Sequence, residues 1–255
     1  MKIVDRGSGP PLVLIPGLQG RWEYMRLAVD ALASSFRVIT FSLDADDFDG
    51  YASQVDRALT EKGIDRATIC GVSFGGLVAL RFAAAYPERC GALVLASTPK
   101  PQLRLRRRHQ LYLRAPWILG PIFVAESPLR LRPEVCAAIP GWGARQRFAL
   151  QGLRTVLSAP ISLSRMAARA RLITTVDLSA DCERITAPTL IVTGERQLDH
   201  VVPVEGSSEY ARRIPNARAI VLERTGHLGT ITRPEAFTDI VRDFVTTSWT
   251  RGRVA

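Results

Sequence analysis

The sequence lacks long hydrophobic runs. The best candidate, residues 111–125, is interrupted by Arg114, Pro116 and Pro121, whereas a membrane-spanning helix requires about 20 uninterrupted apolar residues. The first seven residues also lack the charged end, the apolar stretch and the small-residue cleavage site of a secretion signal. We therefore expect no transmembrane segment and a cytoplasmic protein.

Cysteine is scarce, and the four residues, Cys70, Cys90, Cys136 and Cys182, lie far apart in the chain. They show none of the short paired spacings that zinc or dithiol sites use. Cys70 lies in an apolar run, which favours a small buried side chain over a reactive one. We therefore expect free thiols, no metal and no other cofactor.

Acidic residues are nearly absent from residues 100–180, here called the inserted segment. It contains only Glu126, Glu134 and Asp177 against fourteen basic residues, a net charge of +11, while the rest of the chain has twenty bases and twenty-one acids. Such an excess is typical of a solvated basic face. It also fits an anionic substrate, an acidic carrier protein or an anionic lipid surface. Nucleic acid is not an expected partner, because no nucleic-acid-binding motif is present.

Outside the inserted segment, short apolar runs alternate with stretches of helical periodicity. The runs are continuous in Val, Ile and Leu, which predicts a mostly parallel sheet that is buried on both faces by helices. We expect an α/β fold with a doubly wound sheet formed by residues 1–99 and 181–255, and short helices in residues 100–180 that form a cap. The expected buried strands are 12–15, 37–41, 67–71, 92–96, 189–193 and 218–222, with room for one further strand before them.

The decisive motif is an apolar strand that runs into Gly71-Val72-Ser73-Phe74-Gly75 and then into a helix. A turn this tight brings the positions two before and two after the serine together, so both must have almost no side chain. Gly71 and Gly75 satisfy this requirement. Ser73 is thereby held at a helix N-terminus, where backbone N–H groups favour developing negative charge. We expect Ser73 to be a nucleophile.

A serine hydroxyl needs a base that takes its proton, and histidine is the usual one. The chain contains only three histidines. His227 follows the last expected strand, at the edge of the sheet where the carboxyl ends of parallel strands form a crevice. His109 lies among arginines of the inserted segment, and His200 precedes a helix. We therefore expect His227 to be the base and His200 to be a loop residue or a substrate contact.

The histidine in turn needs a carboxylate that orients it. Asp199 lies in the loop after the preceding strand, which ends at the same edge of the sheet. The expected order along the chain is then Ser73, Asp199, His227. Glu195, in the same loop, is the alternative acid and would otherwise cap the loop.

Together these motifs resemble those of the α/β-hydrolase family, in particular of serine esterases and lipases with a helical cap, over nearly the whole chain. The resemblance implies that residues 11–20 form the first loop of the crevice. It also implies that the backbone N–H groups of Leu18 and Phe74 form an oxyanion hole. In this comparison the inserted segment corresponds to the cap of the family.

The sequence departs from the family pattern at three places. Pro16-Gly17 stands where the family commonly has His-Gly, and the acidic stretch 42–50 replaces an Asp-x-Pro-Gly-x-Gly stretch. The acidic stretch lacks the ligand spacing of a calcium loop, so we expect a solvated loop and a helix cap there. The spacing from Gly194 to Asp199 is two residues longer than the common form.

The residues and the resemblance predict a cofactor-independent serine hydrolase that cleaves a carboxylic ester, a lactone or a thioester through an acyl-enzyme. Carbon–carbon bond hydrolases and acyltransferases of the family use the same residues, and a non-hydrolytic ligand sensor is a further alternative. The expected substrate is a small acyl compound whose pocket includes Tyr112, Trp117 and Trp142.

Overall fold

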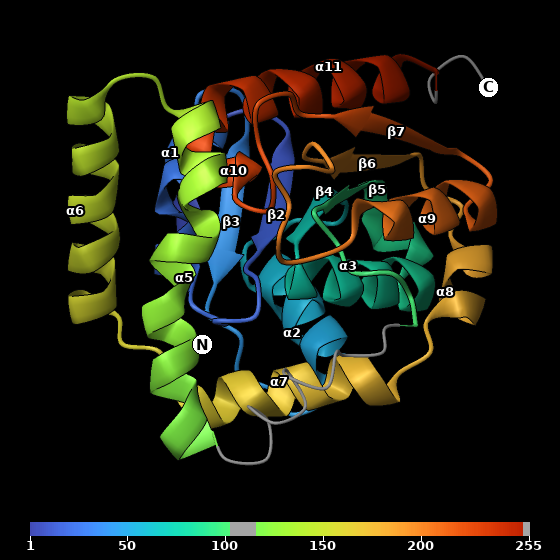
Figure 1. Cartoon of the computed structure of the whole chain (residues 1–255). Coiled ribbons are helices and arrows are strands. Elements are labelled where there is room, and N and C mark those ends of the chain that lie inside the picture. Colours follow the sequence, from blue (N-terminus) through green and yellow to red (C-terminus); the bar gives the residue numbers. More distant parts are fainter. Residues whose placement is uncertain (103–115, 252–255) are drawn as a thin grey trace.

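A seven-stranded sheet forms the centre of the structure (Figure 1). The computed structural model describes residues 1–102 and 116–251, of which 116–125 and 249–251 are described by their backbone alone. The strand order is β1-β3-β2-β4-β5-β6-β7, and every neighbouring pair is parallel except β1 with β3. The predicted α/β class with a mostly parallel sheet is confirmed. The strands are β1 (Ile3–Arg6), β2 (Pro11–Ile15), β3 (Arg37–Phe41), β4 (Ala67–Val72), β5 (Cys90–Ala96), β6 (Thr189–Thr193) and β7 (Ala217–Val221).

The strands coincide with the Val, Ile and Leu runs of the sequence. All positions of β4, in the middle of the sheet, are buried. The expectation of burial on both faces is wrong for β7, where Arg218, Ala219 and Val221 are exposed. This strand pairs only with β6 and forms the edge of the sheet, so its outer side has no neighbouring strand to cover it.

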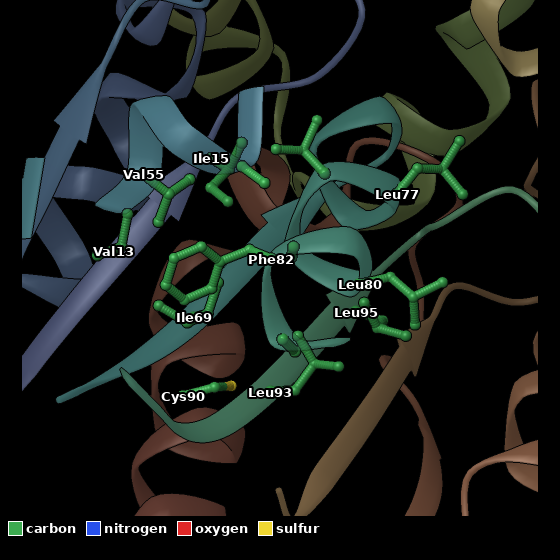
Figure 2. Packing of buried hydrophobic residues seen from close by; sticks show 14 of the residues in the cluster. Val13, Ile15, Val55, Ile69, Leu77, Leu80, Phe82, Cys90, Leu93 and Leu95 are labelled. Atoms are coloured by element: carbon green, nitrogen blue, oxygen red, sulfur yellow. The ribbon is translucent and has the colours of Figure 1, made fainter. Parts of the chain in front are cut away.

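Helices cover both faces of the sheet, because successive side chains of a strand point in opposite directions. Leu12 and Leu14 of β2 belong to one apolar cluster, and Val13 and Ile15 belong to the other. Figure 2 shows Val13 and Ile15 in the second cluster, together with Phe82 of α3. The covering helices are α1 (Arg26–Leu32) and α11 (Pro234–Arg251) on the first side, and α2 (Phe48–Glu61), α3 (Phe74–Ala85), α8 (Ser179–Arg184) and α9 (Ser207–Arg213) on the second. The short connecting elements are η1 (Trp22–Met25), η2 (Pro87–Arg89), η3 (Val204–Gly206) and α10 (Gly229–Thr232).

Between β5 and β6 the chain leaves the sheet and forms the helices α5 (Pro116–Ala138), α6 (Trp142–Ser158) and α7 (Leu163–Thr175) of the inserted segment. The prediction of short helices is wrong for α5, a helix of 23 residues that accommodates several prolines. In Figure 1, α6 stands beyond α5, away from the sheet.

In the part of the chain that the structure describes, no helix is long and apolar enough to cross a membrane. The domain boundaries at residues 100 and 180 stay a prediction.

Candidate active site

Ser73 lies on the turn between β4 and α3, with a φ of 56° that residues with a side chain rarely adopt. Its N–H donates to the carbonyl oxygen of Ala96 at 2.8 Å. A Cβ atom at Gly71 would lie 2.1 Å from the carbonyl oxygen of Gly75, and one at Gly75 would lie 2.3 Å from that of Ile15. The close approach of backbone to backbone explains both glycines, and it holds the serine in a strained conformation at the start of α3.

His227 follows β7 and contacts Ser73 from the loop beyond that strand. Its Nε2 lies 3.1 Å from Oγ of Ser73, within hydrogen-bond distance. The imidazole side chain is 11% exposed. A neutral imidazole in this position can accept the hydroxyl proton, which is the geometry that a general base requires.

Asp199 lies in the loop after β6 and faces the other nitrogen of the same imidazole. Its Oδ2 is 3.5 Å from Nδ1 of His227, longer than an ordinary hydrogen bond. Its Oδ1 accepts from the N–H groups of Val201 and Val202, both at 2.9 Å. Burial alone would raise the pKa of Asp199, but His227 and these two N–H groups outweigh it and hold that pKa below its ordinary value. The carboxylate is therefore ionised at neutral pH and can stabilise an imidazolium.

Two glycines bring the loops of Asp199 and His227 together. A Cβ atom at Gly194 would lie 2.4 Å from the carbonyl oxygen of Gly226, and one at Gly226 would lie 2.3 Å from the carbonyl oxygen that precedes Asp199. The long spacing between Gly194 and Asp199 is taken up by a turn, in which the Asp199 N–H donates to the carbonyl oxygen of Glu195 at 3.0 Å. The additional residues therefore do not keep the acid away from the histidine.

Glu195, the alternative acid, has other partners. Its Oε1 accepts from the backbone N–H of Arg224 at 2.6 Å, in the loop after β7. Its Oε2 accepts from the amide of Gln197. The geometry thus joins Asp199 to His227 and uses Glu195 to connect the two loops.

The loop expected to form the oxyanion hole lies against Ser73. A Cβ atom at Gly17 would lie 3.5 Å from Cβ of Ser73, and the turn is closed by a hydrogen bond from the Gly20 N–H to the Gly17 carbonyl oxygen at 2.9 Å. Phe74 is the first residue of α3, and N–H groups in the first turn of a helix have no acceptor within the helix. Leu18 and Phe74 are thus on the two segments that border Ser73, and their role as donors stays a prediction.

Arg169 of α7 is a buried cation that was not predicted from the sequence. Only 3% of the residue is exposed. Its guanidinium donates to the carbonyl oxygens of Leu18 and Gln19, both at 3.3 Å, to that of Leu43 at 3.0 Å, and to the hydroxyl of Tyr51 at 3.2 Å. All four acceptors are neutral. The inserted segment therefore holds the carbonyl oxygens of Leu18 and Gln19, although no local signal separates Arg169 from the other arginines around it.

Glu134 of α5 is a second buried charge that was not predicted. Only 1% of this residue is exposed. Its Oε1 accepts from the N–H of Leu228 at 2.6 Å, directly after His227 in the chain. Glu134 is one of only three acidic residues in the basic inserted segment, and this is the feature of the sequence that could have indicated its role.

The acidic stretch 42–50 has structural partners. Asp47 caps α2 by accepting from the N–H of Gly50 at 2.7 Å, and Asp49 pairs with Arg81 at 2.7 Å. Among residues 1–102 and 116–251, no group of three or more His, Cys, Asp or Glu side chains could hold a metal ion. The stretch therefore acts as the loop and helix cap expected from the sequence.

The three aromatic residues expected in the pocket are not brought together in the described part of the chain. Tyr112 lies outside the described residues, and of Trp117 the structure describes only the backbone, within α5. Trp142 begins α6 and is 73% exposed, so solvent rather than a pocket surrounds it. His109 also lies outside the described residues, and His200 is an exposed loop residue.

A parallel sheet with a serine on a strand–helix turn, and an acid and a histidine in the loops after the last two strands, defines the class of α/β hydrolases. A family model described as the alpha/beta hydrolase fold matches residues 10–234. The chain belongs to this family, and it is an enzyme of the hydrolase class.

Several known proteins are similar over almost their whole length. The pimeloyl-[acyl-carrier protein] methyl ester esterase of Aeromonas hydrophila is 31% identical, over 94% of this chain and 96% of its own. A Cronobacter turicensis protein with a provisional name as a carbamate hydrolase is 27% identical, over 92% of this chain and 90% of its own. The solved structure of the enol-lactonase from Burkholderia xenovorans LB400 has a TM-score of 0.77 at 21% identity, covers 96% of each chain, and supports the fold.

Proposed function

We propose that the protein is a serine hydrolase that cleaves a carboxylic ester through an acyl-enzyme. Ser73 is the nucleophile, His227 the base and Asp199 the acid that orients the histidine. The observation that carries the proposal is the 3.1 Å distance between Ser73 Oγ and His227 Nε2. A strained serine at a helix N-terminus, in contact with a histidine, is the arrangement that activates a hydroxyl for attack on a carbonyl carbon.

The first half of the reaction transfers the acyl group to the enzyme. Ser73 Oγ attacks the carbonyl carbon while His227 Nε2 takes the hydroxyl proton. The carbonyl oxygen becomes an oxyanion, and the N–H groups of Leu18 and Phe74 stabilise it, each donor contributing about 2.7–4 kcal/mol. As the bond between the carbonyl carbon and the alcohol oxygen breaks, His227 gives its proton to the leaving alcohol.

The second half of the reaction releases the acid. His227 removes a proton from a water molecule, whose oxygen attacks the acyl carbon, and the histidine then returns a proton to Ser73 Oγ as the acyl bond breaks. Asp199 stabilises the imidazolium in both halves. A lactone follows the same steps to a hydroxy acid, and a thioester follows them to an acid and a thiol.

An oxygen ester is the favoured substrate class because two similar proteins are named for such bonds, a methyl ester and an enol-lactone. A carbamate, the bond in the provisional name of another relative, passes through the same attack on a carbonyl. Carbon–carbon bond hydrolysis, acyl transfer and ligand sensing without turnover are the alternatives that an experiment must separate.

The decisive experiment measures hydrolysis of nitrophenyl esters from acetyl to dodecanoyl by the wild type and by Ser73→Ala, His227→Ala and Asp199→Asn. We expect each variant to lose about 10⁴-fold or more in kcat. The matched control is Glu195→Gln, which we expect to keep kcat near that of the wild type. The chain length that reacts fastest measures the acyl pocket.

Two outcomes contradict the proposal. If Ser73→Ala retains the wild-type rate, the mechanism is wrong. If the wild type is inactive on all esters but acts on a carbamate or a carbon–carbon bond, or transfers an acyl group to an acceptor other than water, the reaction must be reassigned.

We also propose that the basic surface of the inserted segment attracts the carrier of the substrate. Arg147 and Arg154 are exposed on α6, beside the exposed side chains of Leu150, Leu153 and Leu157. An acidic carrier protein fits this combination, and one relative is named for a substrate on an acyl-carrier protein. The expected result is a KM for a carrier-bound substrate that rises with salt, while the KM for a neutral nitrophenyl ester does not. Salt-sensitive activation by anionic vesicles instead would identify a lipid surface.

A further inference from the structure

One carboxylate of the inserted segment reaches the loop of the catalytic histidine. Glu134, on α5, is almost completely buried, and its Oε1 accepts from the N–H of Leu228 at 2.6 Å. The backbone N–H of Gly226 also faces this carboxylate and lowers its pKa. Gly226 and Leu228 are the residues directly before and after His227. The carboxylate thus holds the backbone directly after the histidine and lies beside the backbone directly before it.

The carboxylate is only partly satisfied. Its Oε2 is buried and has no hydrogen-bond partner among the residues that the structure describes. Burial raises the pKa of Glu134 above its ordinary value, against the opposing effect of the two N–H groups and His227, and the negative charge of Asp199 adds to the rise. A buried polar atom without a partner costs about 1–3 kcal/mol. An apolar side chain would avoid that cost but would leave the Leu228 N–H without this acceptor, so the contact with the His227 loop is what explains a polar side chain at this position.

A second contact joins the same helix to the same loop. Nε of Arg224 donates to the carbonyl oxygen of Ala137, one turn after Glu134, at 3.1 Å. Arg224 is exposed and lies three residues before His227. The end of α5 is therefore tied to the His227 loop at two places, and Glu134 makes the buried one.

We propose that Glu134 is a positioning residue for His227 and that it couples α5 of the inserted segment to the reaction. This inference rests on the proposed function. By accepting from the Leu228 N–H, directly after the histidine, the carboxylate keeps the imidazole directed at Ser73. Its negative charge stabilises the positive charge that the imidazole acquires when it takes the proton. A displacement of α5 on substrate binding would displace the base with it.

The test compares Glu134→Gln with Glu223→Gln, the same substitution at an exposed glutamate of the same loop. The first readout is the rate at which a fluorophosphonate labels Ser73, and the second is kcat and KM for a nitrophenyl ester. For Glu134→Gln we expect the labelling rate and kcat each to fall about tenfold. This loss is a part of the about 100-fold or more that a general base contributes to a reaction rate. We expect KM to stay within about twofold of the wild type. Glu223→Gln should behave as the wild type does.

A pH profile separates positioning from a purely structural role. The acid limb of kcat/KM should move to lower pH in Glu134→Gln, because the imidazolium loses a nearby negative charge while Asp199 and Arg224 stay in place. The melting temperature should not fall, because the substitution removes a buried charge. Wild-type labelling and kcat in Glu134→Gln would overturn the inference. A wild-type protein that the fluorophosphonate does not label would overturn the proposed function instead.

A second variant covers the case in which Glu134→Gln does not fold. Glu134→Asp keeps the charge but draws the carboxylate back from the Leu228 N–H by one methylene. Slower labelling at an unchanged KM would support positioning by Glu134. Labelling at the wild-type rate would overturn it.

Discussion

The sheet and the inserted segment bury different kinds of side chain. Every position of β4 is buried, and four of its residues belong to the apolar clusters: Ala67, Ile69, Cys70 and Val72. By contrast, α6 has no buried residue and exposes Trp142 and Leu157. Two of the most buried side chains of the inserted segment are charged, Glu134 and Arg169. Apolar packing thus fixes the sheet and the turn at Ser73, whereas the inserted segment meets the loops around Ser73 and His227 through two buried charged residues.

The largest expected effect tests the tight packing of the sheet. A Cβ atom at Gly75 would lie 2.3 Å from the carbonyl oxygen of Ile15 and 2.6 Å from that of Pro16. Since both are backbone atoms that cannot rotate away, we expect Gly75→Ala to cost more than about 4 kcal/mol in the free energy of unfolding, or to prevent folding. Urea unfolding measures the loss. A variant as stable as the wild type would show that the turn can open.

The next effect tests the buried charge on α7. Arg169→Met leaves the carbonyl oxygens of Leu18, Gln19 and Leu43 without their donor, so we expect a loss of about 3 kcal/mol and slower acylation of Ser73. Arg147→Met, on the exposed side of α6, should change stability by less than about 0.5 kcal/mol. If both variants lost the same free energy of unfolding, the buried and the exposed arginine would contribute equally to stability, and the comparison would fail.

A smaller effect tests the exposed helix. A Cβ atom at Gly152 of α6 would have no atom within 4 Å, so Gly152→Ala should stabilise the helix by about 1 kcal/mol through helix propensity alone. Hydrogen exchange of the α6 amides should slow accordingly. If urea unfolding is also shifted, α6 unfolds together with the sheet. A loss of stability would mean that this face of the helix is covered in solution.

The last and smallest effect is a pH dependence. Because burial raises the pKa of Glu134 above its ordinary 4.5, the folded protein holds this proton more tightly than the unfolded chain does. Wild-type stability is then highest below the ordinary pKa and falls as the pH rises through the raised one. Glu134→Gln lacks this group, so its advantage in melting temperature over the wild type should grow from acidic to neutral pH. A constant difference would show that Glu134 titrates normally in the folded state.

The fold was predictable where its cause is local. The strands follow from continuous apolar runs, and the turn at Ser73 follows from the spacing of Gly71 and Gly75. The exposure of β7 was not predictable in this way, because a run of apolar residues does not reveal whether its strand has one neighbour or two. The length of α5 was also missed, since its prolines favour breaks when only local sequence is considered.

The residues of the candidate site also fall into two groups, those that the sequence predicted and those that it did not. The proximity of His227 and Asp199 was predictable because the carboxyl ends of parallel strands meet at one edge of the sheet, so the sequence alone assigns both loops to that edge. Arg169 and Glu134 depend on which loop each helix of the inserted segment meets. Burial of a charged side chain is a property of that tertiary contact, and the charge count alone assigned the arginines to a solvated face.

The two buried charged residues also limit how freely this enzyme could exchange its inserted segment with that of a relative. A chimera that received a foreign segment in place of residues 100–180 would lose the donor to Leu43 and the acceptor for Leu228. Each group left without a partner inside the molecule would cost about 1–3 kcal/mol. A foreign segment is therefore compatible with the rest of this chain only if it places a cation beside the Leu43 carbonyl oxygen and an anion beside the Leu228 N–H.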